Sequence, residues 1–376
     1  MHISIPTYIF LSIINIILAY IDMTDLTCSP DAIIKTEKLS FPFKTPDPFL
    51  FCVYHRDLYP AGNEKMEAPK VGNGADFNFN SDYRMYHGKK IPGFPQHPHR
   101  GFETITATME GLIDHTDSKK NSGRYGEGDV QWMTAGSGIV HGENFPLVNK
   151  DRPNYTKFFQ IWLNLESKKK MVEPMFKMHW ANDIPVIIKE DGGVEIRVWA
   201  GKFEKETALD PPPNSWANNN ENEVGIFAIT LKPGKSVLIP SAKYGKAINR
   251  ALYFINGTKM ECNGQTFNKK GDRHLTLDAS MDVLCKNLDD NNNGDDIDNN
   301  ENDMLLLILQ GRPINEPVAQ HGPFVMNTKA EIYQAFSDYQ STQFGGWPWE
   351  DDAVVFPRDK GRFSNLNGVE TFPSSS

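Results

Sequence analysis

The chain has 376 residues, of which 23% are charged and 39% hydrophobic, and it carries a formal net charge of -9 at pH 7. This length can bury the cores of two domains of ordinary size, and the composition is typical of a soluble globular protein. The sequence contains no basic block, which argues against direct nucleic-acid binding, because such binding needs clustered Lys and Arg to neutralise phosphates.

Residues 1–21 are largely apolar, and Asn15 interrupts the apolar run at residues 9–19. The run is too short for a stable membrane span, and its length is typical of the apolar region of a signal peptide that is cleaved after Ala19. The segment before it carries His2 but no Lys or Arg, which signal peptides normally have. Two alternatives therefore stay open for the N-terminal extension, residues 1–44: a signal peptide or anchor, or an extension without a targeting role.

From about residue 45 onward, short apolar runs alternate with Gly, Pro, Asn and Asp. This pattern of short strands and frequent turns predicts an all-β barrel or sandwich. The Pro-rich residues 210–214 are expected to form a loop, because proline cannot donate a hydrogen bond inside a central strand. The expected strands are residues 49–54, 103–109, 129–133, 158–165 and 194–199 in the first half and 225–231, 236–240, 251–255, 275–277, 281–285 and 304–309 in the second.

No two of the four cysteines have C-x-x-C spacing; they are Cys28, Cys52, Cys262 and Cys285. Their spacing excludes a zinc ribbon and a thioredoxin-type motif. Cys52 lies within an apolar run, so we expect it to be a small buried hydrophobic residue rather than a reactive thiol.

The second half of the chain repeats the β-rich pattern of the first half. The dipeptides at residues 110–111 and 128–129 resemble those at 256–257 and 271–272, and the two pairs have similar spacing. Two similar barrels in tandem would explain this weak repeat. The second copy lacks a matching set of histidines, so only the first barrel is expected to hold a metal.

We therefore expect an N-terminal barrel at residues 45–180 and a C-terminal barrel at residues 181–327. The Asn- and Asp-rich residues 287–303 lie between two strand-like runs and are expected to be a disordered hairpin insertion. This insertion begins like an EF-hand loop at Asp289, but its twelfth position is Asn300 rather than Glu. Since no helices flank it either, we expect no calcium site.

One helix is predicted near the C-terminus. Thr328 and Glu331 have the spacing of a capping box, in which each side chain bonds the backbone N–H of the other residue. Residues 328–376 are thus expected to form a helix and an aromatic, Pro-rich tail that wraps the surface. The apolar residues of this helix fall on one face, which is expected to dock on a barrel: Ile332, Ala335, Phe336 and Tyr339.

The strongest chemical signal is a pair of short histidine motifs, His97-Pro98-His99 and His141-Gly142-Glu143. Residues i and i+2 of a strand point to the same face, so each motif projects two potential ligands together. Two neighbouring strands could then direct three imidazoles and one carboxylate at a single point. Pro98 fits this arrangement if it lies on an edge strand or at a bulge.

Spacing alone does not decide which carboxylate belongs to the site. Glu103 has the same strand parity as His97 and His99, although a bend through Gly101 would carry it away. Glu103 and Glu143 therefore remain alternatives, one as a metal ligand and the other as a residue that orients an imidazole.

Two further residues, His115 and Asp117, also have same-face spacing. They stand beside the polar residues 118–120, and we expect them to lie in a solvated loop.

Three histidines and one carboxylate leave two positions of an octahedron open for substrate or dioxygen. This ligand set suits a divalent first-row metal with open positions better than a closed structural zinc site. We expect one such metal, Fe²⁺ before the alternatives Mn, Co, Ni or Cu. A metal–oxygen site also needs apolar walls that exclude water. The neighbouring residues expected to form them are Phe94, Phe102, Trp132, Met133 and Phe145.

Three segments resemble the signatures of the pirin family: GFPQHPHRGFET at residues 93–104, GDVQWMTAG at 128–136 and QHGPFVMNT at 320–328. The resemblance extends from about residue 47 to residue 363. It implies a bicupin, that is, two tandem cupin-type β-barrels with a metal in the N-terminal barrel alone. It also implies that the ligands are His97, His99, His141 and Glu143, which resolves the choice of carboxylate in favour of Glu143.

The resemblance implies a function as well. Similar proteins act as quercetin 2,3-dioxygenases, in which dioxygen adds across the heterocyclic ring of a flavonol and carbon monoxide is released. Glu143 would then be both a metal ligand and the catalytic base for the flavonol hydroxyl proton.

Two alternatives stay open. One is an iron-dependent, redox-sensing transcriptional co-regulator that binds a transcription factor, and the other is a structural or stress protein with a vestigial metal site. The partner is accordingly a flavonol-like small molecule or a transcription factor. The resemblance implies a nuclear or cytoplasmic location, whereas a signal peptide at residues 1–19 would imply the secretory pathway. The sequence shows no oligomerisation signal, so we expect a monomer.

Overall fold

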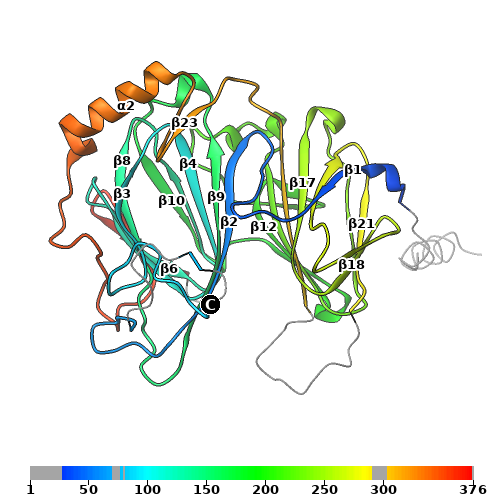
Figure 1. Ribbon diagram of the computed structural model, residues 1–376, viewed down its shortest axis with the longest axis horizontal. Coiled ribbons are helices and arrows are strands. Elements are labelled where there is room, and N and C mark those ends of the chain that lie inside the picture. The colour runs from blue at the N-terminus through cyan, green and yellow to red at the C-terminus, as the bar shows by residue number, and fades with distance from the viewer. Residues whose placement is uncertain (1–27, 70–76, 79–80, 290–302, 375–376) are drawn as a thin grey trace, which may run out of the picture.

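The computed structural model describes residues 28–69, 77–78, 81–289 and 303–374. These residues form two β-barrels that lie side by side (Figure 1). The apolar N-terminal segment, and the Asn/Asp-rich insertion apart from residues 287–289 and 303, fall outside the described residues. Over these described residues the fold is all-β with one short C-terminal α-helix, as the sequence predicts.

The N-terminal barrel consists of two sheets that face each other. One sheet has the strand order β10-β7-β4-β9-β2, and the other has the order β26-β25-β6-β5-β8-β3. The strands are β2 (Phe49–Tyr59), β3 (Gly93–His99), β4 (Phe102–Glu110), β5 (Leu112–Asp117), β6 (Ser122–Gly126), β7 (Val130–Thr134), β8 (Ile139–Asn144), β9 (Asn154–Asn164), β10 (Met175–His179), β25 (Phe363–Leu366) and β26 (Val369–Thr371).

The C-terminal barrel is also built from two sheets, with the orders β1-β20-β17-β22-β15-β12-β11 and β16-β21-β18-β19. Its strands are β1 (Ile33–Glu37), β11 (Val186–Lys189), β12 (Val194–Ala200), β15 (Gly225–Leu231), β16 (Ser236–Ile239), β17 (Asn249–Asn256), β18 (Lys259–Cys262), β19 (Gln265–Asn268), β20 (His274–Asp278), β21 (Val283–Asn287) and β22 (Met304–Gly311). Two small hairpins complete the strands: β13 (Lys202–Phe203) with β14 (Glu206–Thr207), and β23 (Ala319–His321) with β24 (Phe324–Met326). The predicted loop at residues 210–214 is confirmed.

The two barrels have the same internal strand order. The run β7-β4-β9-β2 corresponds to β20-β17-β22-β15, and β3-β8-β5-β6 corresponds to β16-β21-β18-β19. Glu110 and Asn256, which begin the two copies of the predicted repeat, end the equivalent strands β4 and β17. The tandem arrangement expected from the weak sequence repeat is therefore confirmed.

Strands near both ends of the chain join the barrel that is more distant in the sequence. Strand β1 pairs with β20 of the C-terminal barrel, and β25 pairs with β6 of the N-terminal barrel. The tail also contacts the N-terminal barrel through Trp349, whose Nε1 donates to the carbonyl of Asp117 at 2.9 Å. The tail wraps the barrel, as predicted, and in addition extends one of its sheets.

The five-stranded sheet of the N-terminal barrel packs against the seven-stranded sheet of the C-terminal barrel through a continuous apolar core. Cys52 is fully buried in this core, as expected. The interior of the C-terminal barrel is a second apolar cluster that includes Phe227, Leu252, Phe254 and Ile308. The interior of the N-terminal barrel differs, because several polar side chains replace apolar ones there, and these form the candidate site.

Helix α2 (Lys329–Thr342) begins with the predicted capping box, in which Thr328 and Glu331 bond each other's backbone N–H. Its Ile332 and Ala335 are buried against Phe324 and Met326 of the β23–β24 hairpin, which confirms the predicted docking face. Short 3-10 helices lie at Pro30–Ala32, Ser167–Lys169, Glu190–Gly192, Trp216–Asn218, Asn220–Asn222, Gly245–Ala247 and Gln343–Gly345. Within the part of the chain that the structure describes, no helix has both the length and the apolar character needed to cross a bilayer.

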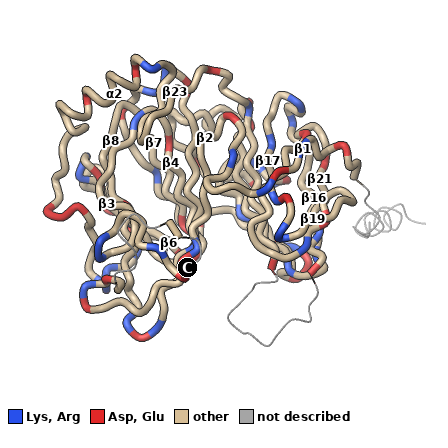
Figure 2. The backbone as a smooth tube through the Cα atoms, viewed as in Figure 1, with Lys and Arg blue, Asp and Glu red and all other residues tan. Residues whose placement is uncertain are grey.

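Lys and Arg are interspersed with Asp and Glu along the backbone of both barrels (Figure 2).

Candidate metal and substrate site

Two adjacent strands bring the three predicted histidines together. Strand β3 lies at the edge of its sheet and pairs with β8, so that His97 stands directly opposite His141. The register shifts between Phe94 and His97, which is the irregularity that Pro98 was expected to need.

The ligand atoms of His97, His99 and His141 all lie within 4.8 Å of one another. The ring centroid of His97 is 4.4 Å from that of His141 and 4.8 Å from that of His99. His141 is fully buried, His99 is buried and His97 is half-buried. Three imidazoles from two strands thus converge at one point, with access from one side.

Backbone carbonyls determine which imidazole nitrogens are free to bind a metal. Nδ1 of His97 lies 2.9 Å from the carbonyl of Pro95, and Nδ1 of His99 lies 3.4 Å from the carbonyl of Pro323. A carbonyl can only accept, so each Nδ1 carries the proton and each Nε2 keeps its lone pair. This is the usual arrangement around histidine metal ligands.

The environment also keeps these imidazoles neutral. Burial lowers the pKa of His97 to about 4. Burial, followed by the proximity of His97, lowers the pKa of His99 and of His141 well below the usual range. Neutral imidazoles are the form that binds metal ions.

A metal ion fits the donor set. Both ring nitrogens of His141 are buried and have no hydrogen-bond partner among the described residues. An unpaired buried polar atom destabilises the fold by about 1–3 kcal/mol, and a metal ligated by one of these nitrogens would remove part of that cost. The donors that converge are three nitrogens, which suits a first-row divalent ion better than calcium or magnesium.

Glu143 lies beside the histidines but is held by other side chains. Its Oε1 accepts hydrogen bonds from Thr106 at 2.9 Å and from the Tyr125 hydroxyl at 3.3 Å, and its Oε2 accepts one from Gln160 Nε2 at 3.3 Å. Burial raises its pKa, whereas the bond from Thr106 and the proximity of His115 oppose that rise. The structure thus places Glu143 next to the histidine cluster without including its carboxylate in the cluster.

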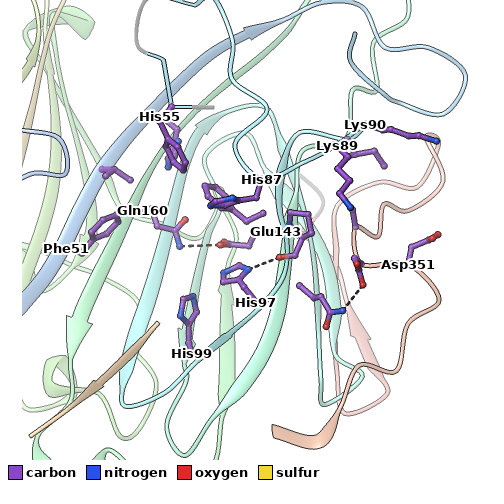
Figure 3. A pocket seen from close by; sticks show the side chains of 18 of the residues that line it. Phe51, His55, His87, Lys89, Lys90, His97, His99, Glu143, Gln160 and Asp351 are labelled. Carbon is purple, nitrogen blue, oxygen red and sulfur yellow. Dashed lines mark hydrogen bonds between the residues drawn. The ribbon is translucent and has the colours of Figure 1, made fainter. Parts of the chain in front are cut away.

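A cavity of about 1200 Å³ opens onto His97, His99 and Glu143 (Figure 3). Its inner wall is largely apolar and comes mainly from β2, β3 and β9. That wall includes Phe51, Val53, Phe94, Pro95 and Trp162. Its rim carries charges of both signs from Lys65, Glu67, Lys89, Lys90, Asp351 and Asp352. The site is therefore an apolar chamber with a polar, mixed-charge entrance.

The prediction of the apolar walls was largely wrong. Phe94 lines the cavity, and Phe102 contacts the His99 ring at 5.1 Å. Trp132 instead belongs to the core between the barrels, and Met133 and Phe145 belong to other buried clusters. Nearness in sequence to the histidines does not place a side chain in the cavity, because strands β2 and β9 supply much of its wall from distant parts of the chain.

Glu103 lies on the opposite face of β4 from the site. Its carboxylate accepts hydrogen bonds from Thr134 at 2.7 Å and from Ser215 at 2.5 Å, on the side that faces the C-terminal barrel. Gly101 has a φ of +87°, and the chain bends there. Glu103 therefore does not point to the same side as His97 and His99, although its sequence spacing from them is even.

The prediction that His115 and Asp117 lie in a solvated loop was wrong. Both residues lie in strand β5 and are fully buried. His115 stands opposite Glu143 and Asp117 opposite His141, with His115 Nε2 3.5 Å from Asp117 Oδ2. The polar residues 118–120 form the turn after β5, so their solvation does not extend to the strand.

The C-terminal barrel does not repeat the histidine cluster, as expected. His141 in β8 lies opposite Asp117 at the end of β5, and Cys285 in β21 lies opposite Cys262 at the end of β18. Cys285 thus takes the position equivalent to His141. The other predicted ligand positions are occupied by Val237, Ile239 and Asn287.

Sequence reasoning missed the residues that hold Glu143. Thr106 gave a usable signal, because Thr104, Thr106 and Thr108 recur at every second position and alternate with the apolar Ile105, Ala107 and Met109. Such alternation indicates a polar inner face. Gln160 gave no comparable signal, because it is a single polar residue within the apolar run of residues 158–163.

Two family models match the chain. The model described as Pirin matches residues 61–163, and the model described as Pirin C-terminal cupin domain matches residues 226–345. A pirin-like protein of Solanum lycopersicum is 36% identical over 250 residues, which are 66% of this chain and 75% of that protein. Pirin-1 of Arabidopsis thaliana is 35% identical over 259 residues, which are 67% of this chain and 78% of that protein.

Solved structures show the same similarity. A crystal structure of quercetin 2,3-dioxygenase from Acinetobacter baumannii aligns with a TM-score of 0.61 and 26% sequence identity. The alignment covers 80% of this chain and 87% of that chain.

Proposed function

Because this chain belongs to the pirin family, we propose that it is a metal-dependent oxygenase of the quercetin 2,3-dioxygenase type. Its substrate would be a flavonol or a similar small aromatic molecule. The observation that carries this proposal is the convergence of His97, His99 and His141 at the inner wall of a large, mostly apolar cavity. The similarity to a quercetin 2,3-dioxygenase structure supports the same class of reaction.

In this proposal His97, His99 and His141 hold one divalent metal, with Glu143 as the fourth ligand. Such a metal, when bound, supplies a Lewis acid for the substrate oxygen and the redox chemistry that reaction with dioxygen requires. Fe²⁺ is the proposed ion, with Mn, Co, Ni and Cu as alternatives, since nitrogen and oxygen donors accept several first-row metals.

The protein's own residues have two further proposed roles. Glu143 lines the cavity and accepts the proton of the substrate hydroxyl at its carboxylate. The aromatic walls formed by Phe51, Phe94 and Trp162 hold a planar substrate and exclude water. Together they favour a hydroxylated aromatic molecule over a flexible polar one.

The direct test is to purify residues 28–376 without oxygen, identify the bound metal by elemental analysis, and follow flavonol loss and carbon monoxide release after oxygen is admitted. His97→Ala should reduce metal affinity by more than about 100-fold, because loss of a ligand should cost more than loss of a residue that only hydrogen-bonds a ligand. His321→Ala is the matched control, because His321 is exposed and its ring packs against Phe336 of helix α2 rather than against the other histidines. Metal binding by His97→Ala at the wild-type level would contradict the assigned site.

Glu143→Gln separates the two roles proposed for that residue. Loss of metal from the variant would support the ligand role, whereas retention of metal with loss of most turnover would support the base role and contradict the ligand role. Wild-type protein that binds iron or manganese but consumes no flavonol would refute the oxygenase proposal and favour the redox-sensing alternative.

A further inference from the structure

A chain of buried hydrogen-bonding side chains ends at the cavity wall. The Tyr86 hydroxyl lies 2.7 Å from Oδ2 of Asp57 and 2.7 Å from Nδ1 of His55. Arg84 donates to Oδ1 of Asp57 through its backbone N–H at 2.9 Å and through Nε at 2.8 Å. All four residues are buried, and His55 lines the cavity (Figure 3).

The chemistry of these groups sets the direction of each hydrogen bond. Burial raises the pKa of Asp57, and the charge of Arg84 and the donated hydrogen bonds oppose that rise. A carboxylate only accepts, so Tyr86 gives its single O–H to Asp57 and its oxygen accepts a bond from Nδ1–H of His55. The neutral imidazole then carries its lone pair on Nε2, which has no hydrogen-bond partner within the described chain.

His55 is also held in place and kept neutral. Its ring stacks on Phe158 with centroids 4.4 Å apart and meets the Tyr86 ring edge-on at 4.8 Å. Burial, followed by the charge of Arg84, lowers the pKa of His55 to about 3. The cavity wall therefore contains a fixed acceptor that stays uncharged across the physiological pH range.

The pairing of β2 with β9 locates this acceptor relative to the histidine cluster. Trp162 lies 5.4 Å from the His99 ring, whereas His55 stands opposite Phe158. Phe158 and Trp162 are four residues apart in an extended strand, which is about 13 Å. The Phe94 ring lies between His55 and the cluster, 6.0 Å from the His55 ring and 6.2 Å from the His97 ring. A ligand of several linked rings can span this separation.

We propose that His55 is a specificity-determining residue whose Nε2 accepts a hydrogen bond from a second hydroxyl group of the substrate. This inference rests on the proposed function and narrows its substrate class. The substrate would be an aromatic compound with a metal-binding oxygen at one end and a phenolic hydroxyl at the other. An acceptor without a proton at Nε2 selects a hydroxyl over an ether or an unsubstituted ring, because only the hydroxyl can donate.

Binding without oxygen tests this inference separately from turnover. Quercetin and 3-hydroxyflavone share the metal-binding hydroxyl and carbonyl, but only quercetin carries further ring hydroxyls. Their Kd values for the metal-loaded protein can be measured by quenching of intrinsic fluorescence. We expect quercetin to bind about tenfold more tightly, and His55→Phe to reduce that preference by about fivefold while leaving 3-hydroxyflavone almost unaffected.

Tyr86→Phe provides a second variant that keeps the His55 ring and removes the bond to Nδ1. Because the proton of His55 can then move to Nε2, the preference for quercetin should fall by about twofold to threefold. Tyr54→Phe is the matched control, since Tyr54 lies on β2 and packs against Phe159 on the opposite face of the strand. It should leave both Kd values unchanged, and thermal unfolding of all variants checks that they fold.

The possible outcomes separate the two proposals. An equal preference for quercetin in wild type and His55→Phe would overturn the inference even if the enzyme consumes flavonols. Loss of the preference in His55→Phe, together with no oxygen-dependent turnover in wild type, would support the inference and overturn the proposed oxygenase activity. Failure of the wild-type protein to bind either compound would overturn the inference as well.

Discussion

The hydroxyl of Ser215 donates a 2.5 Å hydrogen bond to Oε2 of Glu103, which joins the C-terminal barrel to strand β4 of the N-terminal barrel. Thr134 donates to the other carboxylate oxygen at 2.7 Å. Burial raises the pKa of Glu103 from 4.5 to about 7. The interface between the barrels therefore contains a carboxyl group that titrates near neutral pH.

Glu103 should make the stability of the protein depend on pH. Its pKa is higher in the folded chain than in the unfolded chain, so the folded state binds the proton more strongly and is favoured at low pH. This stabilisation, about 3 kcal/mol from the pKa difference, is complete below pH 4.5 and is lost as the pH rises through about 7. Urea unfolding at several pH values between 5 and 8 measures it.

Glu103→Gln isolates the contribution of this residue from that of other buried carboxyl groups. The variant should lose less stability between pH 5 and pH 8 than the wild type does. Glu206→Gln, at an exposed position, should behave as the wild type. An unchanged pH dependence in Glu103→Gln would show that Glu103 is already ionised at pH 5 in the folded protein.

Gly101→Ala should destabilise the protein and weaken metal binding. Gly101 has a φ of +87°, and an added Cβ would lie 2.0 Å from the carbonyl oxygen of Val325. The backbone must move, and His99 lies two residues away. We expect a loss of about 2–4 kcal/mol in the free energy of unfolding, from backbone strain and steric overlap together.

Gly192→Ala is the control, because Gly192 has a similar φ of +82° but an added Cβ there would have no atom within 4 Å. It should cost about 1 kcal/mol, from conformational strain alone. Equal losses in the two variants, measured by urea unfolding, would contradict the steric argument at Gly101.

Arg124→Met should be among the most destabilising substitutions in the N-terminal barrel. Arg124 forms a buried, two-point ion pair with Asp114, with both N–O distances at 2.7 Å, and also donates to the tail carbonyls of Pro357 and Lys360. Removing one partner leaves the other charge buried, which costs about 3–5 kcal/mol. Urea unfolding should show this loss, and limited proteolysis should show release of the tail.

The exposed Arg152 provides the control, because Arg152→Met should change the free energy of unfolding by less than about 0.5 kcal/mol. Adding Asp114→Asn to Arg124→Met should cost less than the sum of the two single changes, because the pair acts as a unit. Strict additivity would contradict the ion-pair argument.

Thr106→Val should impair the site without unfolding the protein. The change is nearly isosteric and removes the 2.9 Å hydrogen bond to Oε1 of Glu143. Loss of a group that orients a metal ligand or base typically costs about 10- to 100-fold in metal affinity or activity. Metal content and flavonol turnover, measured together, report the effect.

Thr104→Val is the matched control for Thr106→Val. Thr104 is buried two residues earlier on β4, and its hydroxyl forms no hydrogen bond within the described residues. If both variants lose metal affinity and turnover equally, the effect comes from packing of β4 rather than from the bond to Glu143.

The sequence was sufficient wherever structure depends on local spacing. The same-face spacing of His97 with His99, and of His141 with Glu143, follows from the two-residue period of a strand and predicted the histidine cluster. The capping box at Thr328 and the apolar stripe of helix α2 depend equally on short-range geometry, and both were confirmed. The weak repeat between the halves correctly predicted two barrels, because equivalent turns follow equivalent strands.

Only the tertiary structure decided how distant segments meet. The bend at Gly101 turns Glu103 toward the other barrel, and strand pairing buries His115, which stands beside polar turn residues in the sequence. Much of the cavity wall, including the proposed acceptor His55, comes from strands far from the histidine motifs. The physical reason is that strand periodicity fixes which side chains share a face, whereas hydrogen bonding between remote strands determines what that face contacts.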